Sequence, residues 1–157
     1  MKKRLIYFCY IPNYELSEKG KFIYEFNFKM LKKYINIFDE SIFLLSIDDV
    51  NNEELIEEGK ERIYNLKPRG DIEIHVVKND QYLRESQCYY DYVITKMEKL
   101  DGLTFYGHCK GFTAIDRPLV DFENMLEWVA GSYYFNLEEK YIPDLLWGNI
   151  AYGAFKT

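Results

Sequence analysis

Four apolar runs of strand length are spaced along the chain. Residues 5–10 are continuously apolar, residues 42–47 are apolar except for Ser46, residues 71–77 alternate between apolar and polar positions, and the stretch 103–115 begins apolar and ends in a polar, glycine-punctuated turn. Continuous runs indicate strands that are covered on both faces, whereas alternation indicates a half-buried strand. The pattern therefore predicts four strands, three of them buried.

The segments that follow these strands have apolar residues at helical spacing. Apolar residues recur three or four positions apart in residues 18–38, 53–66, 83–100 and 119–129. The first of these stripes consists of Phe22, Phe26, Met30, Tyr34 and Ile37. Alternating strands and helices predict an α/β fold with a mainly parallel sheet, helices on both faces and right-handed crossovers. No linker or repeat divides the chain, so we expect a single domain over residues 1–157.

Composition narrows the function classes. The chain is 48% hydrophobic and 29% charged, as is typical of soluble globular proteins, and its net charge of −6 argues against a nucleic-acid-binding face. Its three cysteines, Cys9, Cys88 and Cys109, include no C-x-x-C pair, which argues against a disulfide scaffold and suits a reducing cytoplasm. The basic start and its short apolar run lack a cleavage site, and no stretch has the length of a membrane span. We therefore expect a cytoplasmic protein.

Polar residues follow each predicted strand, at the edge of the sheet where α/β proteins bind ligands. They are Pro12, Asn13 and Tyr14 after the first strand, Asp48 and Asp49 after the second, Asn79 and Arg84 after the third, and His108, Cys109, Lys110 and Gly111 after the fourth. Together they would suit a nucleotide: the carboxylates could bind its base or ribose, the tyrosine could stack on the base, and the cationic side chains could bind its phosphates. Simpler roles are also open: the aspartates as a solvated turn or helix cap, Arg84 as an exposed charge or a partner of Glu85, and Tyr14 as packing.

Several catalytic classes find little support in the sequence. No glycine-rich phosphate loop follows a strand, which weakens a dinucleotide or NTPase interpretation. His108 and Cys109 are neighbours on a predicted strand and would point to opposite faces, so they form a poor nucleophile–base pair. A pair of Cys88 with His108 stays open, because sequence alone does not fix its geometry. The two histidines have no metal-ligand spacing, so a metal site is weakly supported.

One motif carries a family resemblance. Tyr106, His108, Lys110 and Gly111 resemble the Y-x-H-[TS]-K-G motif of bacterial polysaccharide-type glycosyltransferases of the GT-A fold, with Cys109 in the small-residue place. Trp128 falls in the following predicted helix, as in that family. The segments around residues 5–13 and 79–84 also resemble the first strand and the third-to-fourth-strand segment of this fold. The resemblance spans most of the chain and implies a Rossmann-like GT-A half.

The resemblance implies a nucleoside-diphosphate sugar as donor, a saccharide as acceptor and no organic cofactor. The donor-binding residues would be Pro12, Asn13, Tyr14, Asp48, Asp49, Asn79, Arg84, Tyr106 and Gly111, and the catalytic residues His108, Lys110 and Asp116. The metal-binding Asp-x-Asp of the family is missing at this position. Lys110 and Arg84, with His108, could supply the positive charge that a leaving diphosphate needs. Alternatively Asp116 and the diphosphate could hold Mn²⁺ or Mg²⁺.

Chain length leaves a second function open. The chain is short for the family, whose general base lies in the acceptor half. The sequence therefore also allows a domain that is truncated at its C-terminus, or a non-catalytic binding or partner module on the same scaffold. It predicts neither the sugar, the stereochemistry of transfer nor the oligomeric state.

Overall fold

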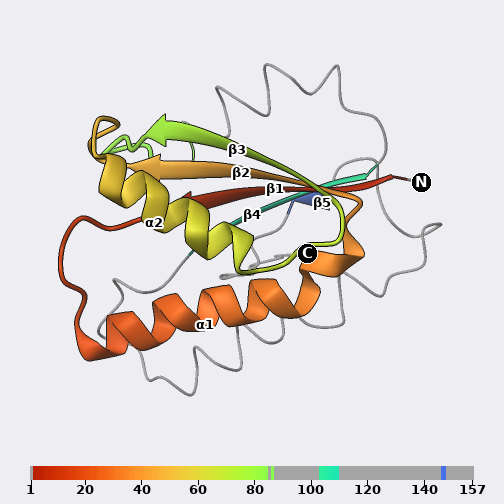
Figure 1. The fold of residues 1–157 in the computed structure, drawn as a ribbon, viewed down its shortest axis with the longest axis horizontal. Coiled ribbons are helices and arrows are strands. Elements are labelled where there is room, and N and C mark those ends of the chain that lie inside the picture. Colours follow the sequence, from red (N-terminus) through yellow and green to blue (C-terminus); the bar gives the residue numbers. More distant parts are fainter. Residues whose placement is uncertain (1, 85, 87–102, 110–145, 148–157) are drawn as a thin grey trace.

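A parallel sheet forms the centre of the computed structural model, which describes residues 2–84, 86, 103–109 and 146–147. Its strands are β1 (Lys3–Tyr10), β2 (Glu40–Ile47), β3 (Asp71–Lys78), β4 (Leu103–His108) and β5 (Leu146–Trp147). They are ordered β3-β2-β1-β4-β5, and every pairing is parallel (Figure 1). The predicted α/β class with a parallel, Rossmann-like sheet is confirmed.

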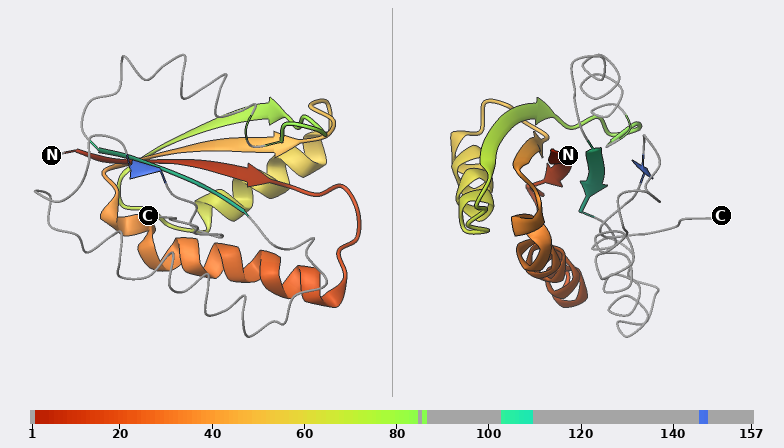
Figure 2. Two further views of the ribbon diagram at one scale, coloured as in Figure 1. Left: turned by 180° about the vertical axis from the view of Figure 1, so that it is seen from behind. Right: turned by 90° about the vertical axis from the view of Figure 1, so that its right-hand side faces the viewer.

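Two helices cover one face of this sheet (Figures 1 and 2). Helix α1 spans Glu18–Tyr34 and continues into a 3-10 helix, Ile35–Ile37, while α2 spans Glu53–Tyr64. The N-terminal end of α1 is capped by Ser17, whose hydroxyl accepts a hydrogen bond from Gly20 N. Asn52 caps α2 in the same way, because its side chain accepts a hydrogen bond from Leu55 N. Within the described ranges, neither helix combines the length and apolar character needed to span a bilayer.

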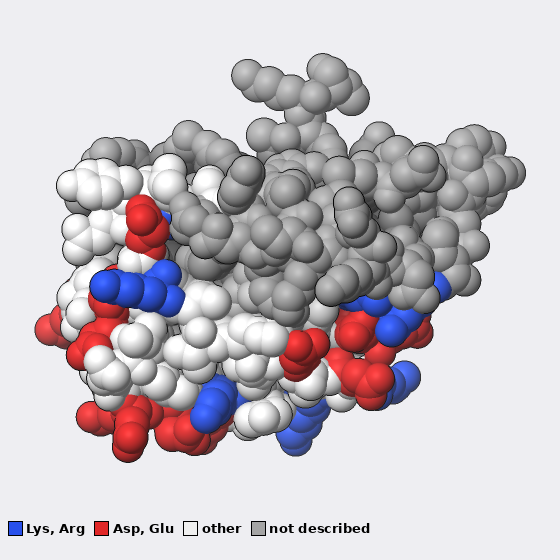
Figure 3. Space-filling view, turned by 90° about the horizontal axis from the view of Figure 1, so that it is seen from above, with Lys and Arg blue, Asp and Glu red and all other residues white. Residues whose placement is uncertain are grey.

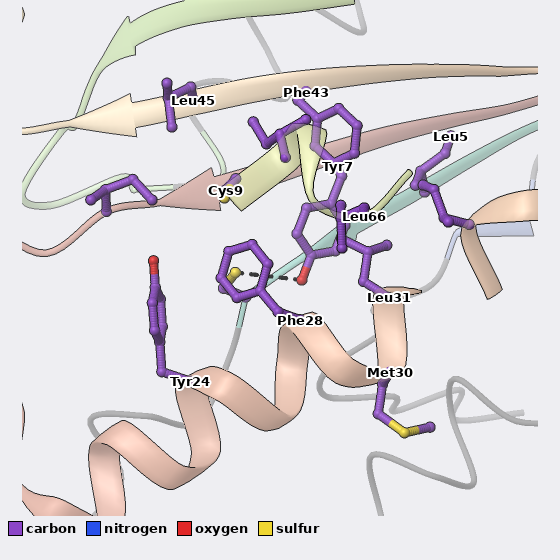
Figure 4. Close-up of a cluster of buried hydrophobic side chains, with 14 of the residues drawn as sticks. Leu5, Tyr7, Cys9, Tyr24, Phe28, Met30, Leu31, Phe43, Leu45 and Leu66 are labelled. Atoms are coloured by element: carbon purple, nitrogen blue, oxygen red, sulfur yellow. Dashed lines mark hydrogen bonds between the residues drawn. The ribbon is translucent and has the colours of Figure 1, made fainter. Parts of the chain in front are cut away.

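The main core lies between these helices and the sheet (Figure 4). From β1 it contains Leu5, Tyr7 and Cys9, and from β2 it contains Phe43 and Leu45. The intervening residues of both strands, such as Ile6 and Leu44, are also fully buried. Burial on both faces is what the continuous apolar runs predict, and each large side chain buried in this way contributes about 1.5–3 kcal/mol.

The predicted apolar stripe of α1 is partly wrong. Phe22 is 42% exposed, whereas Ile23 and Leu31 are buried in the core. Residues four apart drift by about 40° per step around a helix of 3.6 residues per turn, so a strict four-residue stripe leaves the core-facing side. Phe22 instead stacks on Phe26 at the surface, with 6.1 Å between ring centroids.

The chain after β3 also departs from the prediction. Residues 81–84 form a turn, and Arg84 has a positive φ of 46°, so a helix does not begin at residue 83. Asp80 caps this turn, because its Oδ1 accepts hydrogen bonds from the N–H groups of Tyr82 and Leu83. Apart from residue 86, which is helical, the remainder of that predicted helix lies outside the described residues, as do the helix predicted over residues 119–129 and Trp128. The short strand β5 was not predicted.

Candidate functional site at the carboxyl edge of the sheet

The chain reverses its direction of travel across the sheet between β1 and β4. From β1 it proceeds to β2 and β3 on one side, whereas β4 pairs with the other side of β1. In open α/β sheets the ligand crevice lies at this switch point, outside the carboxyl ends of the strands. The ends of β1 and β4, at Tyr10 and His108, therefore mark the candidate site.

Asp48 holds the carboxyl ends of three strands together. Its Oδ2 accepts a hydrogen bond of 2.8 Å from the Tyr10 hydroxyl, and its Oδ1 accepts one of 2.7 Å from Asn79 Nδ2. Tyr10 ends β1, Asp48 follows β2 and Asn79 follows β3. A carboxylate oxygen has two lone pairs, so each oxygen retains capacity for a ligand donor. Asp48 is half-buried, which leaves it accessible from this edge.

Tyr10 is kept in its protonated form. Burial above all, and then the hydrogen bond to Asp48, raise the pKa of Tyr10 well above its ordinary value. Tyr14 adds to this effect, whereas the positive charge of Arg84 opposes it, so both side chains lie close enough to act on the Tyr10 hydroxyl. Hydrogen bonds thus join Tyr10, Asp48 and Asn79 at this edge, and the charges of Tyr14 and Arg84 also act on the pKa of Tyr10.

Other predicted residues at this edge have simpler surroundings. Asp49 is exposed, and its Oδ1 accepts a 3.0 Å hydrogen bond from Asn51 N, as in a turn before a helix. Asn13 is exposed and Pro12 is half-buried in the loop after β1. Tyr14 is 50% exposed, so the structure does not support a packing role for its ring.

The polar residue that ends β4 is buried. His108 is 7% exposed, and its Nδ1 lies 3.1 Å from the carbonyl oxygen of Cys109. Cys109 belongs to the core under α1, and His108 does not. Tyr106 pairs with Ile6 of β1. Lys110, Gly111 and Asp116 lie outside the described residues.

Sequence reasoning missed Tyr10 as a site residue. It sits at the last position of an apolar strand, where an aromatic residue is ordinarily assigned to the core. Its hydroxyl was the available signal, because a buried tyrosine usually needs a hydrogen-bond partner and Asp48 follows the neighbouring strand.

Charge on the described surface is mixed in sign. In the view of Figure 3, acidic and basic side chains are interspersed, without a continuous patch of one sign on the described part of this face. Among the described residues, no group of three or more His, Cys, Asp or Glu is arranged to hold a metal ion.

No family model, curated protein or solved structure matches the chain. What the chain does is therefore inferred from the sheet order and the side chains at its carboxyl edge.

Proposed function

We propose that the chain is a glycosyltransferase-like domain that binds a nucleoside-diphosphate sugar and transfers the sugar to a saccharide acceptor. One observation carries the proposal: Asp48, held by Tyr10 and Asn79, lies at the carboxyl edge of a parallel sheet and is bonded to the end of β1, the strand at which the strand order reverses. This edge is the ligand-binding side of open α/β sheets.

The chemistry of this edge suits a nucleotide. The remaining lone pairs of Asp48 can accept hydrogen bonds from ribose hydroxyls or from a base N–H. The half-exposed ring of Tyr14 offers an aromatic face on which a base can stack. Arg84 can pair with a phosphate in bidentate fashion. Its positive φ is uncommon for a residue other than glycine, and such conformations cluster at functional sites.

Sugar transfer would place further demands on the residues after β4. The acceptor oxygen bonds to the anomeric carbon while the bond from that carbon to the diphosphate breaks, and negative charge develops on the leaving group. In this proposal Lys110 stabilises that charge, assisted by Arg84 and His108. A divalent cation such as Mn²⁺ or Mg²⁺, if bound, would supply the same charge stabilisation, with Asp116 as its protein ligand.

A thermal-shift screen tests donor binding. UDP-, GDP- and dTDP-sugars should each be added with and without Mn²⁺, and the matching sugar should stabilise the fold as RT ln(1 + [L]/Kd). Lys110→Ala should weaken binding at least about tenfold, or about 1.4 kcal/mol. Lys32→Ala, which removes an exposed lysine of α1, is the matched control and should bind like the wild type. Binding that requires Mn²⁺ would contradict the role of Lys110.

Slow hydrolysis of the bound donor separates the enzyme from its alternative. An enzyme should release free sugar from the donor even without an acceptor. A protein that binds donor but never releases sugar would instead be a non-catalytic binding module.

A further inference from the structure

Two thiols lie side by side where β1 and β4 end. Phe8 of β1 pairs with His108 of β4, and Cys109 N donates a 3.2 Å hydrogen bond to Phe8 O. Continuing this register places Cys9 next to Cys109. Both belong to the core cluster beneath α1, so their side chains share one face of the sheet.

The spacing of the two strands permits a disulfide. Neighbouring strands lie about 4.8 Å apart. Cα atoms that a disulfide joins are roughly 4.4–6.8 Å apart. The two cysteines, which are free in this structure, can therefore be linked without separating β1 from β4.

Hydrogen bonds make the two thiols unequal. The sulfur of Cys109 accepts hydrogen bonds from the Cys9 thiol, from the Tyr7 hydroxyl at 3.4 Å and from the backbone N–H of Tyr10. The bond from Cys9 above all lowers the pKa of Cys109, although burial opposes it, and Tyr7, Tyr10 and the charge of Arg62 add to the lowering. The same bond and burial raise the pKa of Cys9. Cys109 is thus the more reactive sulfur, with a protonated partner beside it.

We propose that Cys9 and Cys109 are a redox site that forms a reversible disulfide on exposure to hydrogen peroxide. The Cys109 thiolate attacks one peroxide oxygen, the O–O bond breaks, and a sulfenic acid forms as hydroxide leaves and takes up a proton. The Cys9 sulfur then attacks the Cys109 sulfur. Its S–H proton joins the departing hydroxyl as water. Two thiols are oxidised, one peroxide is reduced, and two waters form.

The burial of the two cysteines determines which oxidants can reach them. Cys9 is 0% exposed and Cys109 is 6% exposed, which admits a molecule as small as hydrogen peroxide but hinders oxidised glutathione. We therefore expect hydrogen peroxide to oxidise the native protein faster than glutathione disulfide does. This site is independent of any sugar donor.

Mass spectrometry tests the proposal on the full chain. After peroxide treatment, the intact protein should lose the mass of two hydrogen atoms, and non-reducing peptide mapping should join the peptides that contain Cys9 and Cys109. A reducing agent should reverse the change. Cys88→Ser, the matched control, should form the same disulfide. A native protein in which both thiols stay free, or in which Cys88 carries the link, would overturn the proposal.

Two variants test the roles of the individual groups. Cys9→Ser should stop oxidation at the Cys109 sulfenic acid, which dimedone traps. Tyr7→Phe removes one donor to the Cys109 sulfur and should slow oxidation roughly two- to tenfold. Tyr24→Phe, which removes a buried hydroxyl that bonds to Tyr10 O instead, should leave the rate near that of the wild type. Equal slowing in both tyrosine variants would contradict the activation of Cys109 by Tyr7. If Cys9→Ser fails to fold, the wild-type peptide map decides the proposal.

Discussion

The carboxylates at the amino and carboxyl edges of the parallel sheet have different hydrogen-bond partners. At the amino edge, Glu40 forms ion pairs with Arg4 and with Lys2, so its carboxylate is neutralised by cations. At the carboxyl edge, Asp48 is held by two neutral donors, Tyr10 and Asn79, and no ion pair to Asp48 occurs among the described residues.

From this difference we infer that Glu40 contributes to stability, whereas Asp48 is available to bind a ligand. A neutralised carboxylate such as Glu40 keeps strands in register, since Arg4 and Glu40 are register partners of β1 and β2. A carboxylate held by neutral donors keeps its negative charge available for a ligand. We therefore expect changes at the amino edge to affect folding, and changes at Asp48 to affect donor binding.

The largest effect is expected at Gly70, the residue before β3. A Cβ at this position would lie 2.3 Å from the carbonyl oxygen of Asp39, a backbone atom that cannot rotate away. Gly70→Ala should lower the free energy of unfolding by about 3 kcal/mol, as measured by urea denaturation.

Gly59→Ala provides the control for this prediction. Its Cβ would meet side-chain atoms and not backbone, with Leu45 Cδ1 at 2.4 Å and Ile11 Cγ1 at 3.0 Å, and alanine favours the helix by roughly 0.8–1.0 kcal/mol. The net cost should therefore be smaller than at Gly70. Equal losses for the two variants would contradict a rigid amino edge.

Glu40→Gln should have the next largest effect. Partial burial raises the pKa of Glu40, but hydrogen bonds from Arg4 and Lys2 outweigh it, so the folded pKa lies below the ordinary value. The stabilisation is therefore complete above the ordinary glutamate pKa and is lost as the pH falls through the folded value. We expect the free energy of unfolding to fall by about 2 kcal/mol at neutral pH, because Arg4 is only 4% exposed and its ion pair with Glu40 would be removed.

Unfolding free energies measured across an acid titration check this sign. The difference between wild type and Glu40→Gln should shrink as the solution becomes more acidic. A difference that is constant with pH would exclude the ion pair as its cause.

Tyr10→Phe should cost less, about 1 kcal/mol, because it removes one hydrogen bond and leaves Asn79 to hold Asp48. The raised pKa of Tyr10 means that its contribution is present below the ordinary tyrosine pKa and is lost as the pH rises. Tyr7 and Tyr24 also have raised pKa values, so the alkaline loss of stability should become smaller in the variant without vanishing. The loss of stability at alkaline pH can be measured by circular dichroism. If it is the same in Tyr10→Phe as in the wild type, Tyr10 contributes nothing to it.

The smallest effect is expected at Asp49. Asp49→Asn retains an oxygen that can accept the hydrogen bond from Asn51 N, so stability should change by less than about 0.5 kcal/mol. Donor affinity measured by calorimetry should also stay near the wild-type value. A large loss of donor affinity in Asp49→Asn would contradict the proposal that Asp48, and not Asp49, binds the donor.

The apolar pattern predicted the fold better than it predicted the helix surfaces. The apolar runs placed β1 and β2 correctly, because strands that are buried on both faces consist mostly of apolar residues, although Ser46 of β2 is also buried. The apolar stripe of α1 was misassigned at Phe22, because helical spacing does not reveal which of two adjacent stripes faces the sheet. The positive φ of Arg84 also gave no signal, since the residue is not a glycine.

The candidate site was predictable only as a set of loops. Asp48 and Asn79 were selected because they follow strands, and parallel strands end at one edge. Their mutual hydrogen bond depends on strand order, which the sequence alone does not contain. Tyr10 was missed for the same reason, since its partner is found only once β1 lies beside β2.

Calorimetric titration of the wild type and of Asp48→Asn with UDP-, GDP- and dTDP-sugars tests the central claim most directly. The substitution keeps both hydrogen bonds available. The new side-chain NH₂ group can donate to the Tyr10 hydroxyl oxygen, and the new side-chain oxygen can accept from Asn79 Nδ2. Only the negative charge is removed. We predict that the wild type binds one of these donors and that Asp48→Asn binds it at least about tenfold more weakly, with little change in unfolding free energy. Undiminished binding by Asp48→Asn, or no binding by the wild type, would contradict the account.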